Sequence, residues 1–206
     1  MRKVIVQEFI SLDGVVQAPG APDEDTSDGF RYGGWTAPFS GGDDPAGQEF
    51  MAEVLAPADL LLGRKTFEIF EDYWPDHAEN WPGVMEVTKY VVSTSLDEAR
   101  VSGSRWPNCQ VLRNVDEVAE LRRSEGSPLK VWGSSLLVRS LLAQGLVDEL
   151  VLMTYPVVLG RGKRVFEGGA EPATFRLVKG HVTPTGVFLA RYERAGEVRT
   201  GTVGAG

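Results

Sequence analysis

Leu60-Leu61-Leu62-Gly63-Arg64-Lys65-Thr66-Phe67 changes from one secondary structure to another at a single glycine. The leucines predict a buried strand that ends at Gly63, and the residues after it predict the start of a helix. The first N–H groups of a helix lack partners inside the helix, and the helix dipole adds partial positive charge there. Arg64 and Lys65 add full charges, and Thr66 adds a hydroxyl that can cap the helix or bond a ligand. The junction therefore has the chemistry of a phosphate site.

A second junction of the same kind lies at Val131-Trp132-Gly133-Ser134-Ser135. It belongs to a predicted strand–helix–strand unit with a strand over 129–132, a helix over 134–143 and a strand over 147–155. Such a unit makes its two strands parallel and closes with a right-handed crossover. Two strand-to-helix anion sites in one acidic chain favour a dinucleotide phosphate over nucleic acid.

The carboxyl ends of parallel strands form the edge of an open sheet where ligands bind. Gly63, Ser93 and Gly133 each follow a predicted strand, so we expect all three on one rim. The alternative is that the glycines are ordinary turn residues and the serines ordinary helix caps. Neither junction matches GxGxxG or GxxxxGK[ST], so their joint occurrence carries more weight than either one.

The remaining pattern predicts an α/β fold with a mixed sheet, parallel in its centre and antiparallel at one end, flanked by helices. Residues 1–194 are expected to form a single domain, and 195–206 a flexible tail because the last residues are small and polar. The other predicted strands cover 4–12, 89–93, 110–113 and a terminal hairpin of 175–182 and 186–192; the other helices cover 46–56, 65–71 and 116–125.

Composition excludes several classes of function. The net charge of −8 disfavours non-specific binding to nucleic acid and to anionic membranes. A single cysteine, Cys109, excludes an intramolecular disulfide, and with only two histidines we expect no metal site. No apolar run approaches the roughly 20 residues of a membrane helix, so a cytoplasmic protein is expected.

Several blocks together resemble a known family. Gly63-Arg64-Lys65-Thr66 resembles the GRKT element of dihydrofolate reductase-like proteins. Phe9-Ile10-Ser11-Leu12-Asp13-Gly14 resembles the SLDG signature of the reductase domain of the bifunctional riboflavin-biosynthesis deaminase–reductase and its stand-alone bacterial relatives. The family's third block is similar to residues 132–135, 146–150 and 156–162. The resemblance spans residues 3 to about 193 in the right order.

The resemblance implies a three-layer α/β sandwich of the dihydrofolate reductase type, NADPH as cofactor, and a homodimer. One departure is that Ser134 stands where the family often has a second glycine, which restricts how closely the backbone can approach a phosphate. The resemblance implies that each part of NADPH has its own contacts. Gly63, Arg64, Lys65 and Thr66 would hold the adenosine 2′-phosphate, and Ser93 and Thr94 would line the adenine-ribose. Gly133, Ser134, Ser135 and Leu136 would hold the pyrophosphate, and backbone groups of the segment Val15–Ala18, Val16 and Ala18 included, would contact the nicotinamide.

Proton delivery and substrate contact have weaker candidates. Asp13 ends the first strand beside the expected nicotinamide and is the first candidate proton donor, although Asp before Gly is equally typical of a turn. Glu49 is the second, because dihydrofolate reductases place a carboxylate on the corresponding helix; a solvent-exposed helical glutamate is the alternative. Trp35 and Trp74 lie in loops 17–45 and 72–83 and could stack on a flat substrate or pack at the edge of the core.

The sequence therefore predicts an NADPH-dependent reductase that transfers a hydride to a small heterocyclic, carbonyl or imine substrate. Reduction of a phosphoribosylaminopyrimidine in the riboflavin pathway is the enzymatic alternative. A module that binds NADPH without turnover is the alternative from another class.

Overall fold

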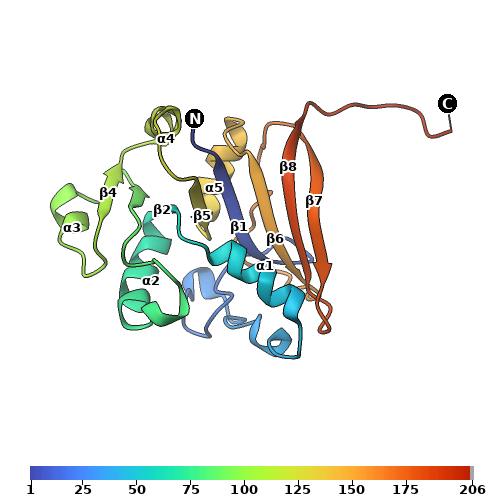
Figure 1. Cartoon of the computed structure of the whole chain (residues 1–206), viewed down its shortest axis with the longest axis horizontal. Helices are drawn as coiled ribbons and strands as arrows, with labels where there is room; N and C mark the ends of the chain where they lie inside the picture. Colours follow the sequence, from blue (N-terminus) through green and yellow to red (C-terminus); the bar gives the residue numbers. More distant parts are fainter. Residues whose placement is uncertain (205–206) are drawn as a thin grey trace.

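One mixed sheet organises the computed structural model, which describes residues 1–204. Figure 1 shows the sheet from β4 on the left to β7 on the right. The six strands β1 to β6 run parallel, whereas β8 is antiparallel to β6 and β7 is antiparallel to β8, so the predicted arrangement is confirmed. The strand order is β4-β3-β2-β5-β1-β6-β8-β7, with bounds β1 Val4–Ser11, β2 Asp59–Gly63, β3 Lys89–Val92, β4 Cys109–Leu112, β5 Leu129–Trp132, β6 Glu149–Tyr155, β7 Thr174–Val182 and β8 Phe188–Gly196.

Helices cover both faces of this sheet, which gives the predicted three layers. Helices α1 (Pro45–Leu55) and α2 (Arg64–Tyr73) pack on one face, and α4 (Val115–Arg123) and α5 (Ser135–Ala143) on the other. The leucine run of β2 shows why both faces must be covered. Successive strand residues point to opposite sides, so Leu60 and Leu62 enter the cluster under α1 and α2 while Leu61 enters the cluster under α4 and α5.

The predicted strand–helix–strand unit is present as β5, α5 and β6, with one feature that its local pattern does not show. Strand β1 lies between β5 and β6 and pairs in parallel with both. The amino-terminal strand is therefore central, and its carboxyl end meets the ends of β5 and β6 at the ligand-binding edge.

Some connections differ from expectation. A short helix, α3 (Glu98–Ser102), was not predicted; the side chain of Asp97 caps it by accepting a hydrogen bond from the backbone of Arg100 at 2.6 Å. The long loop 17–44 contains two 3-10 turns, and so does the loop after α2. None of the helices in residues 1–204 has the length and apolar composition needed to span a membrane.

The predicted tail, residues 195–206, begins inside the last strand. Strand β8 continues to Gly196, and residues 197–204 carry no helix or strand. The predicted tail also includes residues 205 and 206, which lie outside the described residues.

Candidate functional site

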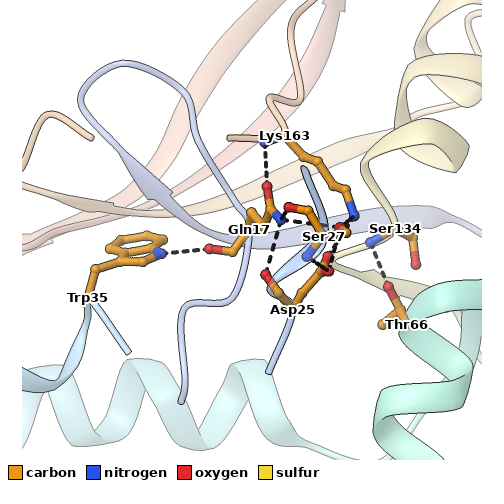
Figure 2. Close-up of polar contacts among 7 residues, drawn as sticks. All are labelled: Gln17, Asp25, Ser27, Trp35, Thr66, Ser134 and Lys163. Carbon is orange, nitrogen blue, oxygen red and sulfur yellow. Dashed lines mark hydrogen bonds and ion pairs between the residues drawn. The ribbon is translucent and has the colours of Figure 1, made fainter. Parts of the chain in front are cut away.

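The two strand-to-helix junctions meet at one point of the sheet edge. The backbone N–H of Gly63 donates to the hydroxyl of Ser134 at 2.9 Å. The N–H of Ser134 donates to the hydroxyl of Thr66 at 2.9 Å, as Figure 2 shows. The Ser134 hydroxyl also donates to the carbonyl of Trp132 at 2.9 Å. The starts of α2 and α5 are thus held side by side by reciprocal hydrogen bonds.

This contact explains the serine that departs from the family pattern. Gly133 and Ser134 both have left-handed backbone angles, with φ of 53° and 55°. A Cβ at position 133 would lie 3.2 Å from the Thr66 hydroxyl, so a side chain there would press against α2. At position 134 the left-handed conformation strains a serine, and the hydrogen bonds of its backbone and hydroxyl offset that strain.

The first turn of α5 keeps free hydrogen-bond donors at this edge. The backbone N–H of Ser134 is already used by Thr66, and the hydroxyl of Ser134 does not cap the helix. The N–H groups of Ser135, Leu136 and Leu137 belong to the helix positions that have no intrahelical acceptor. The side chain of Leu136 is 71% exposed, so nothing large covers this turn. An anion can therefore reach the positive end of α5.

The two predicted cations stand at the start of α2 and face solvent. The Arg64 guanidinium bonds Glu68 one turn along its own helix at 2.9 Å, with half of the Arg64 side chain exposed. Such exposed pairs contribute at most about 1 kcal/mol, so the guanidinium is free to exchange Glu68 for a phosphate. Lys65 is also exposed. Thr66, in contrast, bonds Ser134, which is a different role from the predicted cap or ligand contact.

Ser93 and Thr94 follow β3 on the same edge, as expected. Ser93 is buried, and its hydroxyl accepts hydrogen bonds from the backbone of Ser95 at 3.2 Å and of Leu96 at 3.1 Å. That hydroxyl shapes the turn after β3. Thr94 is exposed and is the one of the pair whose side chain faces solvent.

Asp13 does not have the geometry of a proton donor. Its carboxylate accepts hydrogen bonds from Ser11 at 2.7 Å, from the backbone N–H groups of Leu159 at 3.1 Å and Gly160 at 2.9 Å, and from Arg164 at 3.1 Å. Burial acts to raise the pKa of Asp13, but these donors outweigh it and hold the pKa far below its usual range. The group stays ionised, and its role is to fasten the loop after β6 to the end of β1.

Glu49, the second candidate proton donor, has its side chain in solvent. It is exposed on α1, whose inward residues are Gly47, Phe50 and Val54. Glu49 directly precedes the inward-facing Phe50. Because neighbouring helix positions are about 100° apart, its side chain points to solvent. This position favours the interpretation of Glu49 as a solvent-exposed helical glutamate.

The segment Val15–Ala18 is buried, but several of its backbone groups are already bonded. The N–H of Val16 donates to the carbonyl of Lys163 at 2.9 Å, and the carbonyl of Ala18 accepts from Gly34 at 2.9 Å. The carbonyl of Gln17 accepts the indole N–H of Trp35 at 2.8 Å. The N–H of Val16 is therefore not free for a nicotinamide, whereas the carbonyls of Gln17 and Ala18 each keep a second lone pair that can accept a hydrogen bond.

Trp35 and Trp74 pack into the protein. Trp35 is 6% exposed, and its ring meets Tyr155 edge-on at 5.3 Å. Trp74 packs on Trp81 at 4.9 Å, and its indole nitrogen is buried with no partner among the described residues. For Trp35 this is the packing role, not substrate stacking. Burial raises the pKa of Tyr155 to about 12, so its phenol stays protonated.

A polar cluster that the sequence patterns did not predict joins loop 17–44 to the loop after β6 (Figure 2). Lys163 bonds the Asp25 carboxylate at 2.6 Å and the Ser27 hydroxyl at 2.8 Å. The Gln17 amide donates to the carbonyls of Asp25 and Ser27, each at 3.1 Å, and accepts from the backbone of Lys163 at 3.1 Å. We call these four residues the loop clamp. Lys163 lies 136 to 146 residues from its three partners in the chain, so in the sequence only the basic turn 160–164 indicated this cluster.

Glu8 is a second unpredicted group, buried on β1 directly beside the β5–α5 junction. Burial raises the pKa of its carboxyl well above the usual range, and a hydrogen bond from the backbone of Gly133 opposes this only in part. Burial therefore disfavours the ionised form of Glu8, and its carboxyl contacts the backbone of Gly133 at the start of the second junction. An acidic residue inside an apolar strand was the available signal.

Comparisons with known proteins agree with this architecture. The RibD C-terminal domain model matches residues 2–189. The uncharacterized protein YyaP of Bacillus subtilis (strain 168) is 30% identical over 139 residues, 65% of this chain and 72% of the relative. A solved structure from Shewanella sp. PV-4, provisionally assigned to riboflavin biosynthesis, has a TM-score of 0.65 at 20% identity, covering 94% of this chain and 99% of that one.

Dihydrofolate reductase from Enterococcus faecalis, solved in complex with NADP(H) and RAB-propyl, has a TM-score of 0.55 at 16% identity, covering 93% of this chain and 96% of that one. These likenesses confirm the dihydrofolate reductase-like fold. Because the family model covers nearly the whole chain, this protein belongs to the RibD C-terminal domain family.

Proposed function

We propose that this protein is an NADPH-dependent reductase that transfers a hydride to a small heterocyclic, carbonyl or imine substrate. The observation that carries the proposal is the pair of interlocked helix starts at Gly63–Thr66 and Gly133–Ser135. Two helix N-termini held side by side, with Arg64 and Lys65 next to them, make one extended anion-binding edge. Family membership in a group of reductase domains supports the same function.

The donors at this edge fit a phosphorylated dinucleotide. The free N–H groups of the first turn of α5 can hold a pyrophosphate, and Arg64 and Lys65 can hold a separate phosphate one helix away. Gly133 lets the two helices approach, because any Cβ there would touch Thr66. When bound, NADPH supplies the hydride, while this chain binds and orients it.

The charges favour NADPH over NADH. Hydrogen bonds to charged groups contribute about 1.5–3 kcal/mol each, which corresponds to a tenfold or larger difference in affinity. Only NADPH carries the 2′-phosphate that would use the two cations. Breaking the Arg64–Glu68 ion pair costs little free energy, because the pair is partly exposed to solvent.

The test is a tryptophan-fluorescence titration with NADPH and NADH. We expect Arg64→Ala to weaken NADPH binding at least tenfold and to leave NADH binding nearly unchanged. Arg105→Ala is the matched control, because Arg105 is similarly exposed and also pairs with an exposed carboxylate, that of Asp76. Equal loss for both cofactors in Arg64→Ala would contradict the assignment.

The structure also favours a second candidate, a module that binds NADPH without turnover. Asp13 is held as an anion and Glu49 faces solvent, so neither supplies a proton. If the protein is an enzyme, we propose that the proton comes from water. The two candidates are separated by following NADPH oxidation at 340 nm with a panel of carbonyls, imines, dihydropterins and a phosphoribosylaminopyrimidine. Turnover of any of these supports the reductase, and binding with no turnover of any favours the module.

A further inference from the structure

A cavity of about 410 Å³ lies beside the loop clamp and is lined by three of its residues, Gln17, Ser27 and Lys163. Its walls come from loop 17–30, from the loop after β6 and from the second turn of α5. Neither Gly63–Thr66 nor Gly133–Ser135 lines it. The cavity therefore uses none of the proposed phosphate contacts of the cofactor edge, although Gln17 of the implied nicotinamide segment lines it. Its volume falls in the range of small-molecule sites.

Three residues of the loop clamp form one wall of the cavity and are held in place by their hydrogen bonds (Figure 2). Gln17, Ser27 and Lys163 line the cavity and are bonded to one another or to Asp25. Gly162 is also part of the wall. It has a φ of +124°, and a Cβ there would lie 2.6 Å from Val15 and 2.9 Å from Phe30. The backbone that presents Arg161 is thus tightly packed on one side.

The cavity has more hydrogen-bond donors than acceptors to satisfy them. Arg139 uses one guanidinium nitrogen on the carbonyl of Arg164 and a second on Glu167, both at 3.0 Å. Its third nitrogen has no partner among the described residues. Arg161 lines the cavity and forms no hydrogen bond or ion pair with any residue of 1–204. A guanidinium carries five donors in a rigid fork that matches a carboxylate or phosphate.

The other charged residues of the cavity determine how many anionic groups a ligand can carry. Asp28 and Glu167 also line the cavity, and Glu167 is already paired with Arg139. Lys163 is neutralised by Asp25. Among the charged residues that line the cavity, Arg161 and Asp28 then remain without a partner of opposite charge in residues 1–204. With one such cation, the site suits a ligand with a single anionic group. Phe30, 4% exposed, adds an apolar wall.

We propose that this cavity is a second ligand site, which binds a small molecule with an apolar ring and a single carboxylate or phosphate, the anion being held by Arg161. The ring lies toward Phe30, and Arg139 adds a donor from α5. The site uses none of the proposed phosphate contacts of the cofactor edge, so it stands or falls separately from the reductase proposal.

The probe is phenyl phosphate, titrated into the protein by calorimetry in the absence of NADPH, with benzyl alcohol as the uncharged comparison. Arg161→Gln should weaken phenyl phosphate binding at least tenfold. Arg176→Gln removes the same charge from the exposed hairpin strand β7 and should change the affinity less than twofold. Benzyl alcohol should bind at least tenfold more weakly than phenyl phosphate.

Asp28→Asn gives a test of the opposite sign. It removes the carboxylate that competes with the ligand, and asparagine tolerates the left-handed φ of 58° at this position. Phenyl phosphate should therefore bind severalfold more tightly to this variant. Equal affinity of the parent and Arg161→Gln, or equal binding of benzyl alcohol, would overturn the proposal. Competition between saturating NADPH and phenyl phosphate would also overturn it, since the cavity would then belong to the cofactor site.

Discussion

Asp13 offers the sharpest test of how the ends of β1 and β6 are held together. Its carboxylate accepts four hydrogen bonds, two of them from backbone N–H groups about 146 residues away in the chain. Asn keeps one oxygen but turns an NH₂ group toward donors, so Asp13→Asn loses the ion pair with Arg164 and at least one backbone bond. Hydrogen bonds to a charged group contribute about 1.5–3 kcal/mol each and are not additive within one cluster. We expect a loss of about 3 kcal/mol of unfolding free energy.

That loss has a measurable size in a chain of this length. For proteins of 150–250 residues, 1 kcal/mol lowers Tm by about 2–4 °C, so Asp13→Asn should melt roughly 6–12 °C below the parent. Urea unfolding followed by circular dichroism at pH 7 gives the free energy directly. Asp76→Asn is the control, because Asp76 is an exposed carboxylate in a surface ion pair, and it should change stability by less than about 0.5 kcal/mol.

The pH dependence separates this explanation from a general effect of the substitution. The pKa of Asp13 is lowered in the folded protein, against about 3.9 in an unfolded chain. Its stabilising contribution is therefore fully present above about pH 4 and is lost as the pH falls below that value. The difference in unfolding free energy between the parent and Asp13→Asn should stay constant from pH 7 to 5 and become smaller at pH 3.5. A variant as stable as the parent at pH 7, or a gap that widens in acid, would refute the reasoning.

Two further substitutions test other contacts. Thr66→Val removes the acceptor of the Ser134 N–H and should cost about 1–3 kcal/mol of unfolding free energy, measured by urea unfolding, because a polar group at a packed junction is left unpaired. Lys130 donates to three carbonyls at the end of α1, and burial lowers its pKa to about 8. Since the unfolded chain holds this proton up to about pH 10.5, parent stability should rise between pH 8 and 10.5; Lys130→Met should reduce that rise, and an unchanged slope would contradict it. Lys89, also with a pKa lowered to about 8, accounts for the part that remains.

Local pattern predicted most of the fold because each element carries its own signal. The leucines of β2 alternate between two cores, and the glycine after them ends the strand where the helix starts. Helix α3 escaped prediction because five residues are too few for a helical period, and its start depends on the side chain of one residue, Asp97.

The candidate site was predicted only as far as its chemistry is local. The cations and the free N–H groups follow from the junction sequences alone. What each polar side chain bonds depends on residues far away in the chain: Ser134 meets Thr66 across 68 positions, and Asp13 meets Gly160 across 147. An Asp before a glycine is compatible with a turn, a proton donor or an anchor, and the choice is made by the loop that packs against it.

These long-range bonds also show which groups a ligand can use. Thr66, Asp13 and much of the segment Val15–Ala18 bond other parts of the chain, so they position the edge of the sheet. The groups left with unused donors are the first turn of α5, the two cations at the start of α2 and, beside the loop clamp, Arg161. The polar groups of the loop clamp are buried or paired with one another. The clamp therefore holds loop 17–44 and the loop after β6 in fixed positions. A chain that holds its loops this firmly can orient a bound molecule without first folding around it, which favours affinity at the cofactor edge and at the second cavity alike.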